Sequence, residues 1–400
     1  FVRRDAFEAQ VREHVLPMVS ERLGREVTVE SVEGAVLPSP RVRIGGLRVA
    51  GRADIPTFTS ESIEAGLRIW PLITSRGRRM VLDRLRFEGP TANLVRLPSG
   101  EWDIPRPPPS KRRVEVDLED VAFSEGSINL LDAGGQPLLE IESISGGGSF
   151  IASALEFRTL TARAYGADID AGGSRFDLGA EPMLWKLDSS VEDLQLQNLP
   201  SRVDPLRGSL GFSLAVSGED VMPAEMGRTA TGSGEVRARD LVWQSLDLRR
   251  GLAQSLGGLL EEAGLPITTQ LAPTETSLGR LDRTVTIRNG WIQVDEPVRF
   301  DSPAGASQIG GRWRLGGELD LEGQTQLDEE FVSTLTQEEL TPDAPVPIRY
   351  RIRGSFANPR IESVDASAFL PLLAEEGARR LRRGLERLLP PLGTETAPTP

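Results

Sequence analysis

The stretch that decides the fold reads LGREVTVESVEGAVLPSPRVRIGGLRVAG over residues 23–51 and FTSESIEAGLRIWPLITSRGRRMVLDRLRFEGPTANLVRLPSGEWDI over residues 58–104. Apolar and polar residues alternate over short segments that Gly and Pro separate, which is typical of strands joined by turns. We therefore predict a sheet whose last strands keep an open edge. The predicted strands cover residues 27–32, 41–49, 62–69, 80–88 and 91–97, with a helical turn over 71–74 and a junction at Gly89-Pro90.

An amphipathic helix precedes these strands, because apolar residues recur every four positions between charged ones. The recurring residues are Phe7, Val11, Val15, Val19 and Leu23. Gly24 is predicted to cap the C-terminus of this helix, and Pro17 is expected to kink it because proline lacks a backbone N–H. The helix should close the N-terminal end of the sheet.

The order of the segments LGREVTV, LPSPRVRIGGLRV, IEAGLRIWPLI, LRFEGPTANLVR and GEWDI resembles the N-terminal region of the AsmA-like family of bacterial envelope proteins. Residues 348–355, followed by Asn358-Pro359 and a helix from Ala366, resemble the end of that family's periplasmic region. The resemblance implies an elongated β groove, related to the bridge-like lipid-transfer proteins, that binds phospholipid or another acyl lipid. It also implies a periplasmic protein tethered to the inner membrane by an N-terminal helix that is absent from this chain, and a role in lipid transport or outer-membrane biogenesis. It supplies no list of functional residues.

Composition narrows the classes of partner. The 400 residues include 41 Gly, 29 Pro and no Cys, which excludes disulfides and thiolate metal sites. The formal net charge of -13 argues against nucleic acid as a general partner, because phosphate binding needs a basic face. The resemblance described above implies an inner-membrane anchor or envelope proteins as further partners.

Four regions are predicted: a cap over 1–105, a basic and proline-rich linker over 106–113, an elongated β-groove region over 114–365, and a basic amphipathic helix with a disordered tail over 366–400. The predicted class is mainly β (α+β), with one long, twisted antiparallel sheet curled into a groove. Strands are expected over 114–123 and 127–131, and further strands separated by turns follow them along the chain. Helices are expected over 245–263, 328–336 and 366–389.

Three helices cannot cover about thirteen strands, so the apolar sheet face must either pack in a two-sheet sandwich or line a trough that binds lipid. The residues predicted to line the groove are Leu155, Phe157, Ile169, Leu210, Phe212, Leu214, Ile287, Ile292 and Val294. A closed β core would instead fit a scaffold or assembly factor for outer-membrane proteins.

No catalytic motif, metal site or cofactor site is predicted. The chain has a single His, which leaves no triad with a histidine base except one using that residue. Carboxylate pairs such as Asp168 with Asp170, or Asp295 with Asp301, would fit a carbohydrate-active β protein only if they faced each other across a cleft. The run 146–148 of three glycines is flanked by strands and predicts a strand-end bend or a bulge.

The C-terminal helix concentrates basic residues beside a leucine stripe. Its arginines are Arg379, Arg380, Arg382, Arg383 and Arg387. Such a helix either lies on an anionic membrane or docks a partner, or it covers the last open strand edge while the arginines pair with acidic strands.

Overall fold

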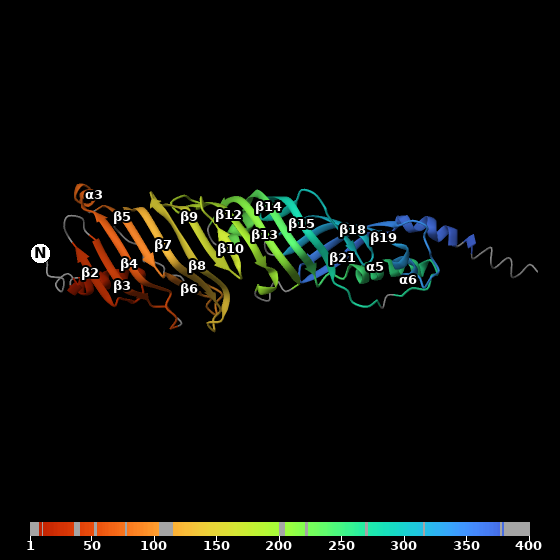
Figure 1. Cartoon of the computed structure of the whole chain (residues 1–400), viewed down its shortest axis with the longest axis horizontal. Coiled ribbons are helices and arrows are strands. Elements are labelled where there is room, and N and C mark those ends of the chain that lie inside the picture. Colours follow the sequence, from red (N-terminus) through yellow and green to blue (C-terminus); the bar gives the residue numbers. More distant parts are fainter. Residues whose placement is uncertain are drawn as a thin grey trace, which may run out of the picture. The chain divides into compact units, whose positions relative to one another are not determined.

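The computed structural model describes residues 8–9, 11–35, 41–51, 54–76, 78–103, 115–199, 205–220, 223–268, 271–314, 317–376 and 378–379. The chain is mainly β, as predicted, and its 21 described strands belong to one sheet and not to two (Figure 1). It divides into two compact units, described separately below. The first unit comprises Phe1–Asp204, Gly208–Ala238 and Asp282–Trp291, and the second comprises Pro205–Arg207, Arg239–Leu281 and Ile292–Pro400.

The first unit begins with the predicted helix, of which Phe7 lies outside the described residues. A π-helical turn η1 (Val11–Val15) gives way to α2 (Leu16–Leu23) at Pro17, so the expected irregularity is a change of helix type. Gly24 adopts the left-handed conformation at φ 61° and caps the helix, as predicted. Apolar residues of both helical segments pack on the strands that follow. The cluster contains Val11, Leu16, Val29, Val32, Val42, Ile44 and Leu47.

The first strands form antiparallel neighbours: β1 (Val27–Thr28), β2 (Ser31–Ala35), β3 (Arg41–Val49) and β4 (Phe58–Arg68). The short helix α3 (Ile69–Thr74) leads to β5 (Arg79–Glu88) and β6 (Thr91–Val95). The junction at Gly89-Pro90 does not reverse the chain, because β5 and β6 both pair antiparallel with β4 and parallel with β7 (Glu115–Leu131). The open edge is thus filled by a parallel strand, and the sheet is mixed where an antiparallel one was predicted.

The predicted linker over 106–113 lies outside the described residues, and the strands on either side of it belong to the same unit. Beyond β7 the first unit continues with antiparallel strands. These are β8 (Pro137–Ile151), β9 (Ala154–Ala164), the short β10 (Ala167–Asp170) and β11 (Arg175–Asp177), β12 (Leu184–Gln195) and β13 (Leu206–Glu219). The 3-10 turn η2 (Leu196–Asn198) and the helix α4 (Pro223–Thr229) lie in loops, and β14 (Thr231–Trp243) and β15 (Thr276–Arg288) follow. Residues 231–238 and 282–288 of these two strands belong to the first unit and their other residues to the second.

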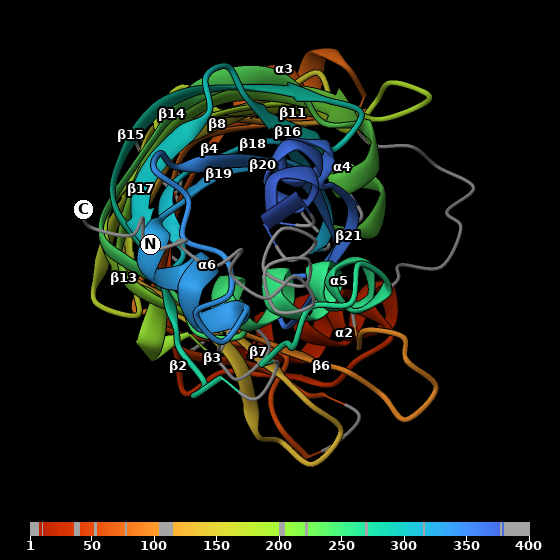
Figure 2. The same cartoon turned by 90° about the vertical axis from the view of Figure 1, so that its right-hand side faces the viewer.

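Bulges in neighbouring strands of the first unit lie beside one another. Gly46, Gly89, Glu125 and Ser143 all have positive φ, between 53° and 62°, in strands or junctions that are adjacent in the sheet. A second set of register shifts crosses β7, β8 and β9 at Leu118/Val121 and Gly147/Gly148. Bulges increase local twist and bend the strand, so aligned bulges bend the sheet along a line. Figure 2 shows the strands of this unit following a curved path.

The three glycines lie in the middle of β8, where they form part of a bulge and not a strand end. Glycine is required there because a Cβ on Gly146 would collide with the Thr159 carbonyl oxygen and lie 3.1 Å from the Phe123 ring. The missing side chains let Phe123 on β7 and Phe157 on β9 meet across β8, with ring centroids 6.2 Å apart and an edge-to-face angle of 83°.

The second unit packs helices on its sheet. Its strands are β16 (Trp291–Val294), β17 (Val298–Ser302), β18 (Gly305–Arg314), β19 (Glu318–Leu327), β20 (Val346–Ser355) and β21 (Asn358–Asp365). Helices α5 (Leu248–Glu262) and α6 (Glu329–Leu335) match the predicted positions and begin at Asp247 and Asp328, whose side chains cap the first turn. Figure 2 shows both helices on the inner side of these strands. Their leucines join Ile348, Tyr350 and Ile352 in one core.

The predicted C-terminal helix starts with a 3-10 turn η3 (Ser367–Phe369) and continues as helix over 370–376 and 378–379. Arg380, Arg382, Arg383, Arg387 and the predicted disordered tail lie outside the described residues. No helix among the described residues is long and apolar enough to cross a bilayer.

Candidate functional site: an apolar sheet face in the first unit

The register of the strands in the first unit aligns apolar side chains across the sheet. Ile44 lies opposite Ile63, Ile63 opposite Phe87, and Phe87 beside Phe123. Farther along the sheet, Ile169 lies opposite Val191, which lies opposite Phe212. Residues opposite one another on adjacent strands point to the same side of a sheet, so each row shares one face.

We call this surface the apolar face. It comprises Ile63, Leu82, Leu85, Phe87, Leu118, Val121, Phe123, Phe150, Leu155, Phe157, Leu160, Ile169, Phe176, Val191, Leu210, Phe212 and Leu214.

Most side chains of the apolar face are half-buried. Ile63 and Val191 are buried, at 8% and 7% exposure, and so are Trp185 and Val216, which the register places on the same face, at 5% and 7%. In the core of the second unit, by contrast, Leu252, Leu256 and Ile352 are 0% exposed. The difference follows from the helices. In the part of the chain that the structure describes, η1 and α2 pack on the first strands of the apolar face, whereas β7 to β12 have no helical layer.

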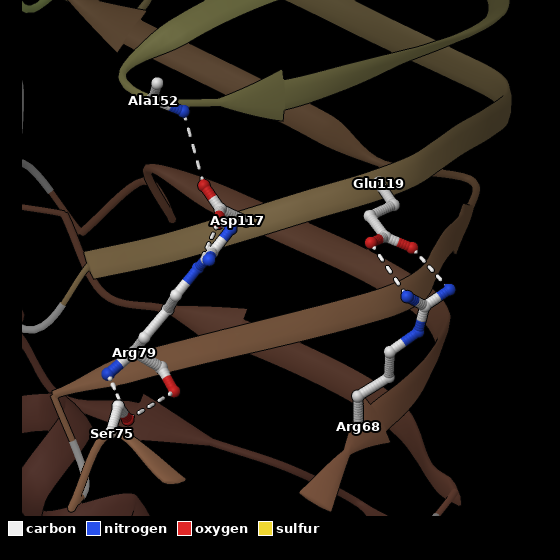
Figure 3. A network of polar contacts seen from close by, with 6 residues as sticks. All are labelled: Arg68, Ser75, Arg79, Asp117, Glu119 and Ala152. Atoms are coloured by element: carbon white, nitrogen blue, oxygen red, sulfur yellow. Dashed lines mark hydrogen bonds and ion pairs between the residues drawn. The ribbon is translucent and has the colours of Figure 1, made fainter. Parts of the chain in front are cut away.

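The opposite face of the same sheet is polar and carries ion pairs between strands. Arg158 Nη2 lies 2.7 Å from Asp120 Oδ1, and Arg68 Nη2 lies 2.7 Å from Glu119 Oε2. Arg79 Nη2 donates to Asp117 Oδ2 at 2.7 Å (Figure 3). Burial of Asp117 acts to raise its pKa, but hydrogen bonds from Arg79 and from the Ala152 N–H, with the Arg79 charge, outweigh burial and lower the pKa. The sheet of the first unit thus has one polar face, whose charged groups water solvates, and one face of aliphatic and aromatic side chains.

Six of the nine predicted groove residues lie together on the apolar face: Leu155, Phe157, Ile169, Leu210, Phe212 and Leu214. Three do not. Ile287 is only 1% exposed and therefore belongs to a packed interior of the first unit. Ile292 and Val294 lie on β16 of the second unit, at 8% and 9% exposure.

Sequence reasoning missed the part of the apolar face that the N-terminal strands contribute, including Phe87 and Phe123. Alternation could have identified Leu85 with Phe87, but Leu82 joins the same face only through a register shift in the pairing of β5 with β4. Phe157 lies between Phe123 and Phe176, with edge-to-face ring contacts at 6.2 and 6.3 Å. The aromatic side chains thus form a continuous strip over β7, β9 and β11.

Asp168 and Asp170, considered above for a carbohydrate site, can be placed among the described residues. No group of three or more metal-ligating side chains occurs among them. Asp168 pairs with Arg163 at 2.7 Å, and Asp170 accepts a hydrogen bond from the Gly172 N–H at 2.8 Å, so both have structural partners. A depression of about 690 Å³ in the second unit is lined by Gln308, Glu322, Gln324 and arginines, which suits a polar ligand and not an acyl chain.

Among the predicted membrane-contacting arginines, the structure describes Arg379. Its Nη2 lies 2.7 Å from Glu375 Oε1, four residues earlier, and both side chains are exposed. This ion pair fits a solvated helix surface and does not by itself identify a membrane contact.

Comparison of the chain with models of known protein families and with curated protein sequences finds no match.

Proposed function

We propose that this chain binds the acyl chains of lipid on the apolar face of its first unit. The observation that carries the proposal is the partial exposure of that face: a continuous set of aliphatic and aromatic side chains spans at least eight strands, and most of these side chains are only half-buried. Monomeric soluble proteins rarely expose apolar patches larger than a few hundred Å² without a ligand or partner.

Acyl chains suit this surface because their recognition needs area and not polar groups at fixed positions. Each methylene removed from water contributes about 0.8 kcal/mol, so a chain that buries about eight methylenes gains about 6 kcal/mol relative to water. The phenyl rings of Phe123, Phe157 and Phe176 extend this contact over three strands. A polar headgroup would remain outside the strip, in water.

The sequence resemblance supports the cellular context of the proposal. We propose that the protein is AsmA-like and non-enzymatic, acts in the periplasm, and is tethered to the inner membrane. There it would contribute to lipid transport or outer-membrane biogenesis. A surface that holds acyl chains without catalytic groups suits such a carrier.

Native mass spectrometry of detergent-free protein, with lipid extraction, tests the proposal. Phe212→Asp puts a carboxylate on the apolar face, and Ser213→Asp puts the same charge on the next residue of β13, which points to the other side. The native chain and Ser213→Asp should carry phospholipid or another acyl lipid, and Phe212→Asp should lose most of it. A native chain that is free of lipid and instead retains an envelope protein would favour the scaffold function.

A further inference from the structure

The short helix α3 presents large apolar side chains to solvent at one end of β4 and β5. Trp70 is 74% exposed and Ile73 is 58% exposed, and Trp70 is the most exposed large apolar side chain among the described residues. Neither side chain belongs to the apolar face, because both lie on the connection between two strands. Trp70 and Ile73 lie three positions apart on one helix, and two large apolar side chains exposed together are more informative than one.

The exposure of Trp70 does not come from a loosely held loop. Figure 3 shows Arg68 and Arg79, which flank α3, bonded to the neighbouring strand β7. Arg68 pairs with Glu119, and the guanidinium of Arg79 donates to Asp117 at 2.7 and 2.9 Å. The backbone N–H of Arg79 also donates to Ser75 Oγ at 2.9 Å. These contacts fix both ends of the α3 connection on the sheet.

The arginines of this connection fall into two classes. Arg68 and Arg79, at the two ends of the connection, have carboxylate partners on β7. Arg76 and Arg78 are exposed and have no ion-pair partner among the described residues. Two uncompensated cations therefore follow directly after the exposed Trp70 and Ile73. This local charge is opposite in sign to the net charge of -13 of the whole chain.

We propose that α3 and the turn after it dock on the surface of an anionic lipid bilayer. Trp70 and Ile73 would enter the interfacial region, where indole rings favour a position between hydrocarbon and water. Arg76 and Arg78 would lie against lipid phosphates. A six-residue helix cannot supply the roughly 800 Å² that each partner buries in a stable protein interface, so a bilayer suits this surface better than a protein does. The inference stands independently of lipid binding on the apolar face.

Flotation of the full chain with vesicles tests the proposal. Phosphatidylcholine vesicles with phosphatidylglycerol should bind the chain, and vesicles of phosphatidylcholine alone should bind it far less. Arg76→Glu with Arg78→Glu should weaken binding at least about 25-fold, because each arginine near an anionic surface contributes about five-fold. Trp70→Ala should weaken binding roughly ten-fold through lost apolar contact.

The matched control is Arg48→Glu with Arg86→Glu. Both residues are exposed arginines on β3 and β5, toward the strand ends away from α3, and the total charge changes equally. This control should float like the native chain. All variants should unfold at the native temperature, because the replaced side chains are exposed. Absence of flotation by the native chain, or equal flotation of the α3 variants and the control, would overturn the proposal. Lipid bound to the apolar face should be unchanged in Trp70→Ala, which separates this test from that of the proposed function.

Discussion

A carboxylate introduced at two apolar positions distinguishes the exposed sheet face of the first unit from the packed core of the second. Ile352 on β20 is 0% exposed in the core that α5 and α6 cover. Ile352→Asp loses about 2–3 kcal/mol of side-chain burial. Burial also raises a carboxyl pKa by up to about 3–5 units. At pH 7 about three of these units count, at 1.36 kcal/mol each, which adds roughly 4 kcal/mol. The sum is comparable with the whole stability of a domain, about 5–15 kcal/mol.

Phe212→Asp should cost far less, because Phe212 is half-buried and a carboxylate there stays in contact with water. We expect a loss of about 1–2 kcal/mol, mainly from apolar contact with neighbours such as Val191, which lies opposite Phe212. Urea unfolding followed by circular dichroism, with limited proteolysis, measures both variants. Ile352→Asp should lose the folded second unit, while Phe212→Asp should keep a native-like transition. Equal destabilisation of the two variants would refute the argument that the apolar face lacks a covering layer.

Three further outcomes are expected. Asp117→Asn should destabilise the first unit at neutral pH. The contact with Arg79 lowers the pKa of Asp117, so the ionised carboxylate stabilises the folded state above about pH 4, and this stabilisation is lost as pH falls through the lowered pKa. The urea midpoint of the native chain should therefore fall in acid. Burial raises the pKa of Tyr350 to about 12, although a hydrogen bond with Thr325 acts to lower it. Above about pH 10 only the Tyr350 of the unfolded chain ionises, so the stability of the folded state should decrease as pH rises. Absorbance measures the ionisation of the tyrosine, and circular dichroism measures the unfolding. Gly258→Ala in α5 should raise the free energy of unfolding by about 1 kcal/mol and therefore raise the thermal midpoint, because the new methyl group meets no atom within 4 Å.

Alternation of apolar residues was sufficient to predict the apolar face but not its extent. Phe157 and Phe212 were recognised because each lies in a clearly alternating strand. Phe87 and Phe123 join the same face through the parallel pairing of β5 and β7, which are separated by more than twenty residues. Parallel pairing depends on long-range register, and no local turn signal specifies it. The burial of Ile287 likewise depends on packing that alternation does not encode.

The positions of the β-bulges could not be predicted from the sequence pattern either. Glu125 and Ser143 adopt left-handed backbone conformations, at φ 54° and 53°, although neither is the glycine that such positions usually favour. From the sequence, residues 124–126 were predicted to be a turn between two strands. In the structure, β7 runs through them as one bulged strand of 17 residues. Helix α4 was missed because its Gly and Pro content is typical of a loop, although Pro223 stands at the first helical position that proline favours.

Short connections explain why part of the apolar face has no helical layer. In the first unit, β8 and β9 are joined by Ala152 and Ser153, both at positive φ, and β9 and β10 by Tyr165 and Gly166. Such two-residue turns bring the chain straight back into the sheet and leave no residues for a covering helix. In the second unit, the segments before β15 and before β20 are long enough to hold α5 and α6, whose leucines fill the sheet's inner side. Tight hairpins combined with alternating sequence thus account for the missing helical layer where β8, β9 and β10 contribute to the apolar face.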